Sequence, residues 1–198
     1  MRFDKLTTQF QSALADAQSL AVGHDNPYIE PQHLLAALLG QQDASAASLI
    51  QRAGGNPLAL RNALQEAIGR LPKVEGSGGE VNLSRELGAL LNVADKLAQK
   101  RGDQFIASEM FLLALMGDKG ETGRLLKQAG VTLPALEAAI EQVRGGQTVT
   151  GQEDEVIKGL SSMPMDEIFL PLFIPPSIGT NQSHPPSAVH PCSSPSYW

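Results

Sequence analysis

The residues best suited to catalysis or metal binding are few and scattered in this chain. The four histidines are His24, His33, His184 and His190, and the single cysteine is Cys192. His24 and His33 lie on either side of a predicted turn, and no pair of cysteines supports a structural zinc site. A nucleophilic cysteine needs an ordered histidine beside it, and the sequence offers Cys192 none. We therefore predict no catalytic residue, no metal site and no cofactor, and we expect the chain not to be an enzyme.

Two acidic residues in the second half of the chain have simple structural interpretations. Glu109 falls in the first turn of a predicted helix, where a carboxylate stabilises the positive end of the helix dipole. Asp103 follows Gly102 in a predicted turn, where an aspartate can bond its own backbone. From the residues alone, both acids are therefore expected to be structural.

The other candidate surface is apolar. A helix predicted over residues 84–101 has a core face formed by Leu87, Leu91, Ala94 and Ala98. Because successive helical residues turn by about 100°, Val93 lies about 100° from the centre of that face, and Leu97 lies on the same flank. Met110 opens the following predicted helix. Such edge residues suit either ordinary packing or an apolar binding surface, and the pattern leaves both open.

These candidates belong to a tandem duplication that organises the chain. Residues 28–40 match residues 105–117 without a gap, at a shift of 77 positions (28 to 105). Both stretches have an aromatic residue and an isoleucine, a helix start, an apolar run and a final glycine. Further along, residues 49–54 match residues 125–130 at a shift of 76. Repetition at a fixed spacing indicates one supersecondary unit used twice.

Each repeat is predicted to contain four helices. Apolar residues recur at i, i+3, i+4 and i+7, and proline and glycine mark helix ends rather than hairpins. In the first repeat we expect helices at about residues 8–22, 31–39, 46–53 and 57–71, and we expect no strand. We predict an all-α fold in which two four-helix units, residues 1–72 and 83–146, form one globular domain over residues 1–150. Residues 73–82 are predicted to be a flexible linker.

Residues 151–198 differ in composition from the rest. Residues 157–198 contain eight prolines and eight serines, but only three charged residues, Lys158, Asp166 and Glu167. A segment with so little to pack is predicted to be largely disordered, apart from one apolar stretch at residues 168–174. We interpret residues 151–198 as a linker remnant and a Pro/Ser-rich tail of natural, frame-shifted or cloning origin.

Charge and hydropathy restrict the partners. The formal net charge of −6 argues against the basic patch that a nucleic-acid-binding protein presents. The first residues lack the apolar core of a signal peptide, and no run of about 18 apolar residues exists. We therefore expect a cytoplasmic protein with neither nucleic acid nor membrane as a partner.

The duplicated pattern resembles the N-terminal domain of the ClpB family, the ring-forming AAA+ disaggregases of bacteria. The similar phrases are ADAQSLA at 15–21, GHDN at 23–26, LPKVEG at 71–76 and DKLAQKRGD at 95–103. The resemblance covers about residues 1–150. Members of that family continue into a coiled linker and two ATPase modules. This chain contains no G-x-x-x-x-G-K-[ST] motif, so it is not expected to bind a nucleotide in the usual way.

The resemblance implies a set of substrate-binding residues. In ClpB-type domains, the apolar members of the set match positions that line a groove for unfolded segments. The polar members match positions that border the surface engaging client protein, as contacts rather than as an acid/base pair. The six candidates in this chain are Thr7, Val93, Leu97, Asp103, Glu109 and Met110.

The resemblance also implies a function. We expect a client-recognition domain that holds exposed apolar segments of unfolded or aggregated proteins in a shallow groove without ATP, together with the rest of a ClpB-type ring. One alternative is an adaptor-docking module of a Clp-family unfoldase, which would bind folded partners through charged side chains. Another is a passive spacer that only orients a motor domain.

Overall fold

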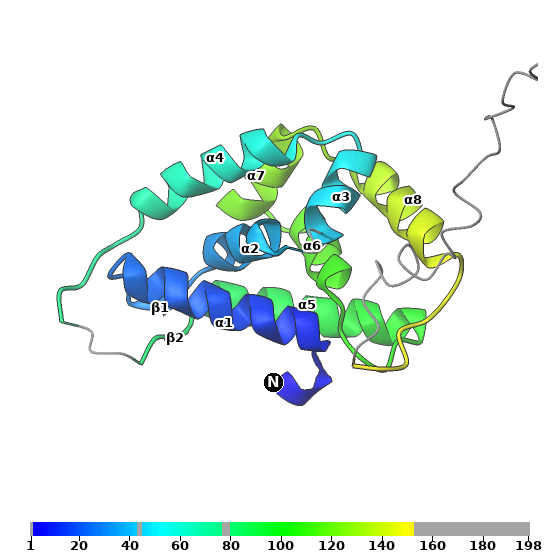
Figure 1. The fold of residues 1–198 in the computed structure, drawn as a ribbon, viewed down its shortest axis with the longest axis horizontal. Coiled ribbons are helices and arrows are strands. Elements are labelled where there is room, and N and C mark those ends of the chain that lie inside the picture. Colours follow the sequence, from blue (N-terminus) through cyan, green and yellow to red (C-terminus); the bar gives the residue numbers. More distant parts are fainter. Residues whose placement is uncertain (1, 43–44, 77–79, 153–198) are drawn as a thin grey trace, which may run out of the picture. The chain divides into compact units, whose positions relative to one another are not determined.

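The computed structural model describes residues 2–42, 45–76 and 80–152. The chain divides into two units, Met1–Met163 and Pro164–Trp198, and the described residues all belong to the first. The Pro/Ser-rich tail, with its apolar stretch at 168–174, lies outside the described residues. Within the described ranges, the chain forms a 3-10 turn (Phe3–Lys5), eight α-helices and two very short strands (Figure 1). The predicted all-α fold is confirmed.

The first repeat forms four helices close to the predicted ranges. They are α1 (Thr8–Gly23), α2 (Pro31–Gly40), α3 (Ser45–Arg52) and α4 (Pro57–Gly69). The hydroxyl of Thr7 caps α1 by accepting a hydrogen bond from the backbone N–H of Phe10 at 3.3 Å. Pro31 occupies the first turn of α2, where a missing N–H leaves no intrahelical bond unmade.

The second repeat forms the matching four helices. They are α5 (Arg85–Arg101), α6 (Ser108–Met116), α7 (Glu121–Gln128) and α8 (Leu133–Arg144). Ser84 caps α5 by accepting from the N–H of Leu87 at 3.1 Å, as Thr7 does for α1. Gly102 and Gly145 end α5 and α8 in the left-handed conformation, which glycine adopts without steric cost. No helix among those described is both long and apolar enough to cross a membrane.

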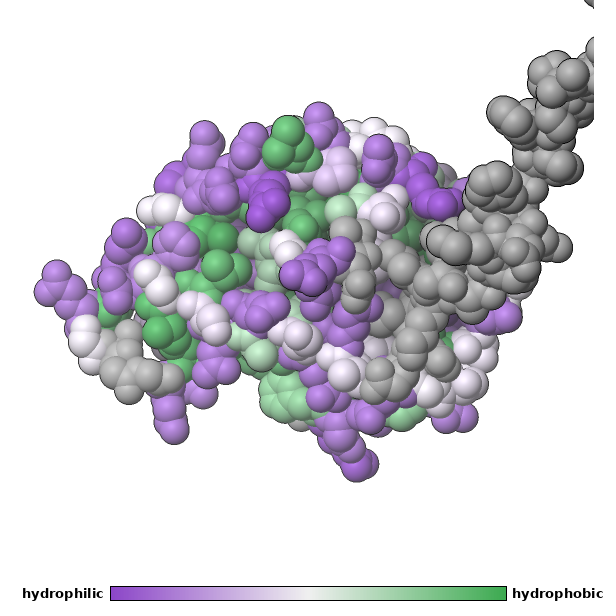
Figure 2. All heavy atoms as spheres, in the orientation of Figure 1, coloured by the Kyte–Doolittle hydropathy of each residue, from purple (hydrophilic) through white to green (hydrophobic). Residues whose placement is uncertain are grey.

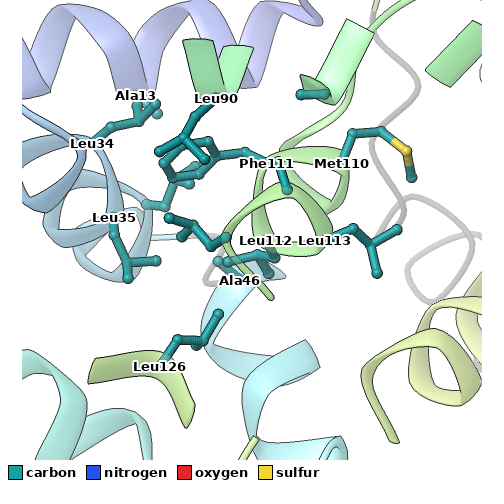
Figure 3. Close-up of a cluster of buried hydrophobic side chains, with 14 of the residues drawn as sticks. Ala13, Leu34, Leu35, Ala46, Leu90, Met110, Phe111, Leu112, Leu113 and Leu126 are labelled. Atoms are coloured by element: carbon teal, nitrogen blue, oxygen red, sulfur yellow. The ribbon is translucent and has the colours of Figure 1, made fainter. Parts of the chain in front are cut away.

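Helices α2 and α6 form the centre of this unit. Every residue of α6 is buried, as expected for a helix that is hydrophobic on all sides. In Figure 1, α2 and α6 lie between the pair α1 and α5 and the outer helices α3, α4, α7 and α8. The rings of Phe10 and Phe111 lie 6.1 Å apart between centroids and join the two repeats in one core. Figure 3 shows Phe111 pointing toward Leu90 and Leu34 in this core.

The prediction that the repeats contain no strand was wrong in one detail. Strand β1 (Tyr28–Ile29) pairs in parallel with β2 (Asn82–Leu83), and Leu6 forms an equivalent isolated bridge with Ile106. Each repeat therefore pairs the segment before its first helix with the other repeat. Two residues are too few to show the alternating pattern by which a strand is recognised in a sequence.

Candidate functional site

An open groove of about 570 Å³ lies between α5, α6 and α8 of the second repeat. Its apolar lining consists of Leu90, Val93, Leu97, Leu113, Ala114 and Leu133. Val93 on α5 is 43% exposed, and Leu133 on α8 is 41% exposed. Both walls of the groove therefore present apolar side chains to solvent, as expected of a surface that binds an apolar ligand.

Charged side chains complete the groove lining. They are Lys100, Arg101, Asp118, Glu137 and Glu141. Arg101 donates from Nη1 to Oε1 of Glu141 at 2.6 Å, which joins the last turn of α5 to α8. This ion pair is partly exposed, so it contributes little to the free energy of folding, but it defines where the two groove walls meet.

A buried cluster of one arginine and two carboxylates lies beyond this end of the groove. Arg144, the last residue of α8, donates from Nη1 to both carboxylate oxygens of Asp103, at 3.0 and 2.9 Å. It also donates from Nε and Nη2 to Oε1 of Glu109, at 2.9 and 2.5 Å. All three side chains are at most 5% exposed. We call this cluster the latch.

One positive charge between two buried carboxylates shapes the electrostatics of the latch. Burial raises the pKa of Glu109 and outweighs the opposing charge of Arg144, while Asp103 raises it further. Burial alone would lower the pKa of Arg144, but Glu109 and Asp103 raise it above its usual value. The guanidinium therefore stays charged, and it is the only group in the latch that balances the acids.

The chain that leaves α8 returns to the latch at once. Gly145 and Gly146 have φ values of 57° and 81°, which allow the chain to reverse directly after Arg144. The N–H of Val149 donates to Oδ1 of Asp103 at 3.0 Å, and the carbonyl of Val149 accepts from the N–H of Gln104 at 2.8 Å. We call residues 147–152 the exit segment.

The end of the exit segment reaches the start of α1. The carbonyl of Gln152 accepts from the N–H of Thr8 at 2.9 Å, and its side chain donates to the carbonyl of Asp4 at 3.0 Å. An N–H in the first turn of a helix has no partner within the helix, so the exit segment provides one. Thr7 therefore lies beside the point where the exit segment meets α1.

The structure does not bring the six predicted site residues together in one site. Val93 and Leu97 line the groove. Asp103 and Glu109 are buried in the latch, and Thr7 is buried as the cap of α1. Asp103 accepts from Arg144 and Val149, so the expectation that it mainly bonds its own turn was wrong.

Met110 is fully buried and does not line the groove in this structure. Figure 3 shows Met110 and Leu113 projecting from the side of α6 opposite Phe111. Leu113, three residues further along the same helix, does line the groove. The structure thus places Met110 in the packing of α6.

Sequence reasoning did not identify Arg144 or the groove residues of α6 and α8. Arg144 is separated from Asp103 by 41 positions and from Glu109 by 35. Its only signal in the sequence is a basic residue before a glycine, which is typical of a helix C-terminus. Leu133 stands at the start of α8, where periodicity does not distinguish an exposed groove residue from a core residue.

The first repeat has a counterpart of the groove with different chemistry. A hollow of about 430 Å³ between α1, α2 and α4 is lined in part by Asp16, Leu20, His24 and Arg61. Asp16 and Leu20 are the counterparts of Val93 and Leu97 at the shift of 77. On the face drawn in Figure 2, hydrophobic side chains show between hydrophilic ones over α1, α2 and α4. The duplication thus produced an apolar groove in one repeat and a more polar hollow in the other.

Neither the groove nor the hollow has the residues of a metal centre. In the part of the chain that the structure describes, no group of three or more histidine, cysteine, aspartate or glutamate side chains is arranged to hold a metal ion. The chemistry available in the groove is therefore apolar contact with a charged rim.

Comparison with known proteins identifies the family. The family model described as "Clp repeat (R) N-terminal domain" matches residues 5–129. "Chaperone protein ClpB" of Vibrio vulnificus is 48% identical over 158 residues, which cover 80% of this chain and 18% of that protein. "Chaperone protein ClpB" of Dichelobacter nodosus is 45% identical over 181 residues, or 90% of this chain and 21% of that protein. The chain thus spans about a fifth of the length of these relatives.

A solved structure supports the fold. The Hsp104 N-terminal domain of Candida albicans is similar with a TM-score of 0.67 and 23% identity, covering 75% of this chain and 97% of that domain. The two helical repeats, the residues matched by the family model and the similarity to bacterial ClpB agree. This chain belongs to the Clp repeat N-terminal domain family.

Proposed function

We propose that the groove between α5, α6 and α8 binds exposed apolar segments of unfolded or aggregated proteins, without nucleotide, as the client-recognition domain of a ClpB-type chaperone ring. The observation that carries this proposal is the pair of exposed apolar side chains, Val93 and Leu133, on facing helices of one groove. The names of the bacterial relatives, which are chaperones, support the same function. In this proposal the domain is a binding module and not a catalyst.

The affinity to expect follows from comparing the free energy of apolar burial with the free-energy cost of association. Burying three aliphatic side chains stabilises a complex by about 5–8 kcal/mol before other terms. Association costs on the order of 4–15 kcal/mol in lost translational and rotational freedom. One domain should therefore bind weakly, and several copies in a ring would gain affinity through multivalency.

The six candidate residues take different roles in this proposal. Val93 and Leu97 contact the ligand directly. Asp103, Glu109 and Thr7 hold the ends of α5, α6 and α1 in place from below the surface. Met110 adapts the packing of α6 to different ligands, since a methionine side chain repacks easily.

The first test charges the groove. Leu97→Asp is expected to weaken binding of the unfolded protein β-casein at least tenfold, because the carboxylate must be desolvated against an apolar ligand. Binding would be measured by fluorescence anisotropy, and helix content by circular dichroism. The matched control is Leu20→Asp, since Leu20 is the counterpart of Leu97 in the first repeat and has a similar partial burial.

The control separates the groove from the duplication. Leu20→Asp should bind β-casein as the wild-type chain does. If Leu97→Asp binds normally with intact helix content, the groove is not the site. If both variants lose binding equally, binding is not specific to the groove of the second repeat.

A second candidate function is docking of a folded adaptor. The hollow of the first repeat favours it, because Asp16, His24 and Arg61 there offer charged and polar contacts. Binding through such residues should weaken steeply with salt, since exposed charges are screened beyond about 8 Å at physiological ionic strength. Binding in the apolar groove should change little between 50 and 500 mM salt (~tenfold range).

A further inference from the structure

We infer that Arg144 is a positioning residue that fixes the α8 wall of the groove and the exit segment together, so that ligand binding and docking of the exit segment reinforce each other. The inference rests on the proposed function of the groove. Neither the sequence nor the family similarity assigns a role to Arg144. The supporting contacts form a continuous path from the groove to Val149.

The path begins on one face of α8. Leu133, Glu137 and Glu141 all line the groove. At about 100° per residue, Arg144 points within about 20° of the direction of Leu133 along the helix. Arg144 therefore continues the groove-facing side of α8 and extends it to the latch.

Two ion pairs fasten this side of α8 to the end of α5. Glu141 of α8 pairs with Arg101 of α5, and Arg144 of α8 pairs with Asp103 just after α5. The first pair is partly exposed, and the second is almost fully buried. Because a buried charge without its partner is costly, the latch holds one arrangement of the two helices rather than a range of them.

The exit segment is bound to the same carboxylate. Oδ1 of Asp103 accepts from Nη1 of Arg144 and from the N–H of Val149, each at 3.0 Å. Gln104 bonds the carbonyl of Val149 from the same turn. If Arg144 moves away, Asp103 loses its orientation and the exit segment loses its hydrogen bond to that carboxylate.

Helix α8 connects the two ends of this path. Its 12 residues form a rod of about 18 Å, so its two ends move together. In this structure the latch is closed and the apolar walls of the groove are open to solvent, and the inference takes this latched form as the one that binds. A ligand that packs between Val93 and Leu133 would hold α8 in that position. Thermodynamic reciprocity then requires that a closed latch strengthens ligand binding and that ligand strengthens the latch.

The test uses the complete chain carrying Arg144→Lys. Lysine keeps the positive charge, but its single ammonium cannot hold both carboxylates as the guanidinium does. We expect the amides of Val149 and Gln104 to exchange with solvent at least tenfold faster, and β-casein to bind about tenfold more weakly. Arg124→Lys is the control, since Arg124 is exposed on α7 and does not line the groove; both measurements should stay unchanged.

The reciprocal measurement excludes a purely structural role. Adding β-casein to the wild-type chain should slow exchange at Val149 and Gln104 severalfold, and it should have no such effect in Leu97→Asp. If β-casein binds Arg144→Lys as tightly as wild type, the coupling is wrong and the groove proposal stands. If β-casein does not bind the wild-type chain, the groove proposal fails and the coupling fails with it.

A second variant covers the case in which Arg144→Lys does not fold. Val149→Pro removes the N–H that donates to Asp103 and changes none of the three latch side chains, Arg144, Asp103 and Glu109. It should weaken β-casein binding severalfold through the exit segment alone. Unchanged binding in Val149→Pro would overturn the inference.

Discussion

His33 shows how one residue can serve the structure of the first repeat while looking like a candidate for chemistry. Its Nδ1 accepts from the N–H of Glu30 at 2.9 Å, which completes a capping box at the start of α2. Its Nε2 lies 2.9 Å from Oδ1 of Asn26, so the neutral ring donates there. Asn26 in turn donates to the carbonyl of Pro72 at 2.9 Å. Burial, followed by the charge of His24, lowers the pKa of His33 to about 4.

The lowered pKa of His33 predicts a specific loss of stability in acid. As the pH falls from about 6.5 to 4, the unfolded chain binds a proton at this residue before the folded chain does, so the free energy of unfolding decreases by about 3 kcal/mol. His33→Gln should lack this decrease, because glutamine at the same capping position offers an acceptor and a donor without titrating. Urea unfolding of both chains at pH 7, 5.5 and 4.5 checks it. If the free energy of unfolding falls equally with pH in both chains, His33 does not titrate between pH 7 and 4.5.

At the scale of elements, the close approach of α7 to the end of α6 depends on a glycine. A Cβ added at Gly123 would lie 2.5 Å from the carbonyl oxygen of Leu115 and 3.0 Å from that of Asp118. Both neighbours are backbone atoms, so the helices would have to move apart. In α5, by contrast, a Cβ at Gly88 would meet no atom within 4 Å.

These two glycines make a matched pair of substitutions. Gly123→Ala should destabilise the fold by about 1–3 kcal/mol, the usual cost of overpacking. Gly88→Ala should stabilise it by about 0.5–1 kcal/mol, because alanine loses less conformational freedom in a helix. Denaturant midpoints measure both effects. A shift of both midpoints in the same direction would contradict the packing described for α7.

At the scale of the whole described unit, the two repeats depend on each other. The N–H of Thr7 donates to the carbonyl of Ile106 at 3.1 Å, and the N–H of Ser84 donates to the carbonyl of Ile29 at 3.0 Å. These hydrogen bonds occupy equivalent positions of the duplication, since Thr7 and Ser84 are 77 residues apart. The residue before the first helix of each repeat thus donates its N–H to the other repeat. The core joins both repeats through Phe10 and Phe111.

These contacts between the repeats predict that neither repeat folds alone. A peptide of residues 2–76 should have less than about half of the helix content of its segment in the intact chain, because it loses its partner for β1 and one side of its core. The peptide of residues 80–152 should behave likewise, and an equimolar mixture should regain helix content. Circular dichroism during heating measures this. Cooperative unfolding of either peptide by itself would show that the repeats are independent.

The sequence by itself determined the duplication, the helical class and most helix boundaries. Proline at the start of α2, the caps Thr7 and Ser84 and the glycine after α5 act over three or four residues, so their effects are visible locally. The edge position of Val93 also followed from the helical period alone, and its 43% exposure agrees with that position.

Only the tertiary structure decided how distant residues meet. It brought Arg144 to Asp103 and Glu109, added Leu133 as the facing wall of the groove, and buried Met110 within α6. It also separated the polar candidates Thr7, Asp103 and Glu109 from the groove, whereas the family resemblance implied that they border the binding surface. The physical reason is that capping and periodicity depend on neighbours along the chain, whereas the meeting of α5, α6 and α8 depends on how whole helices pack.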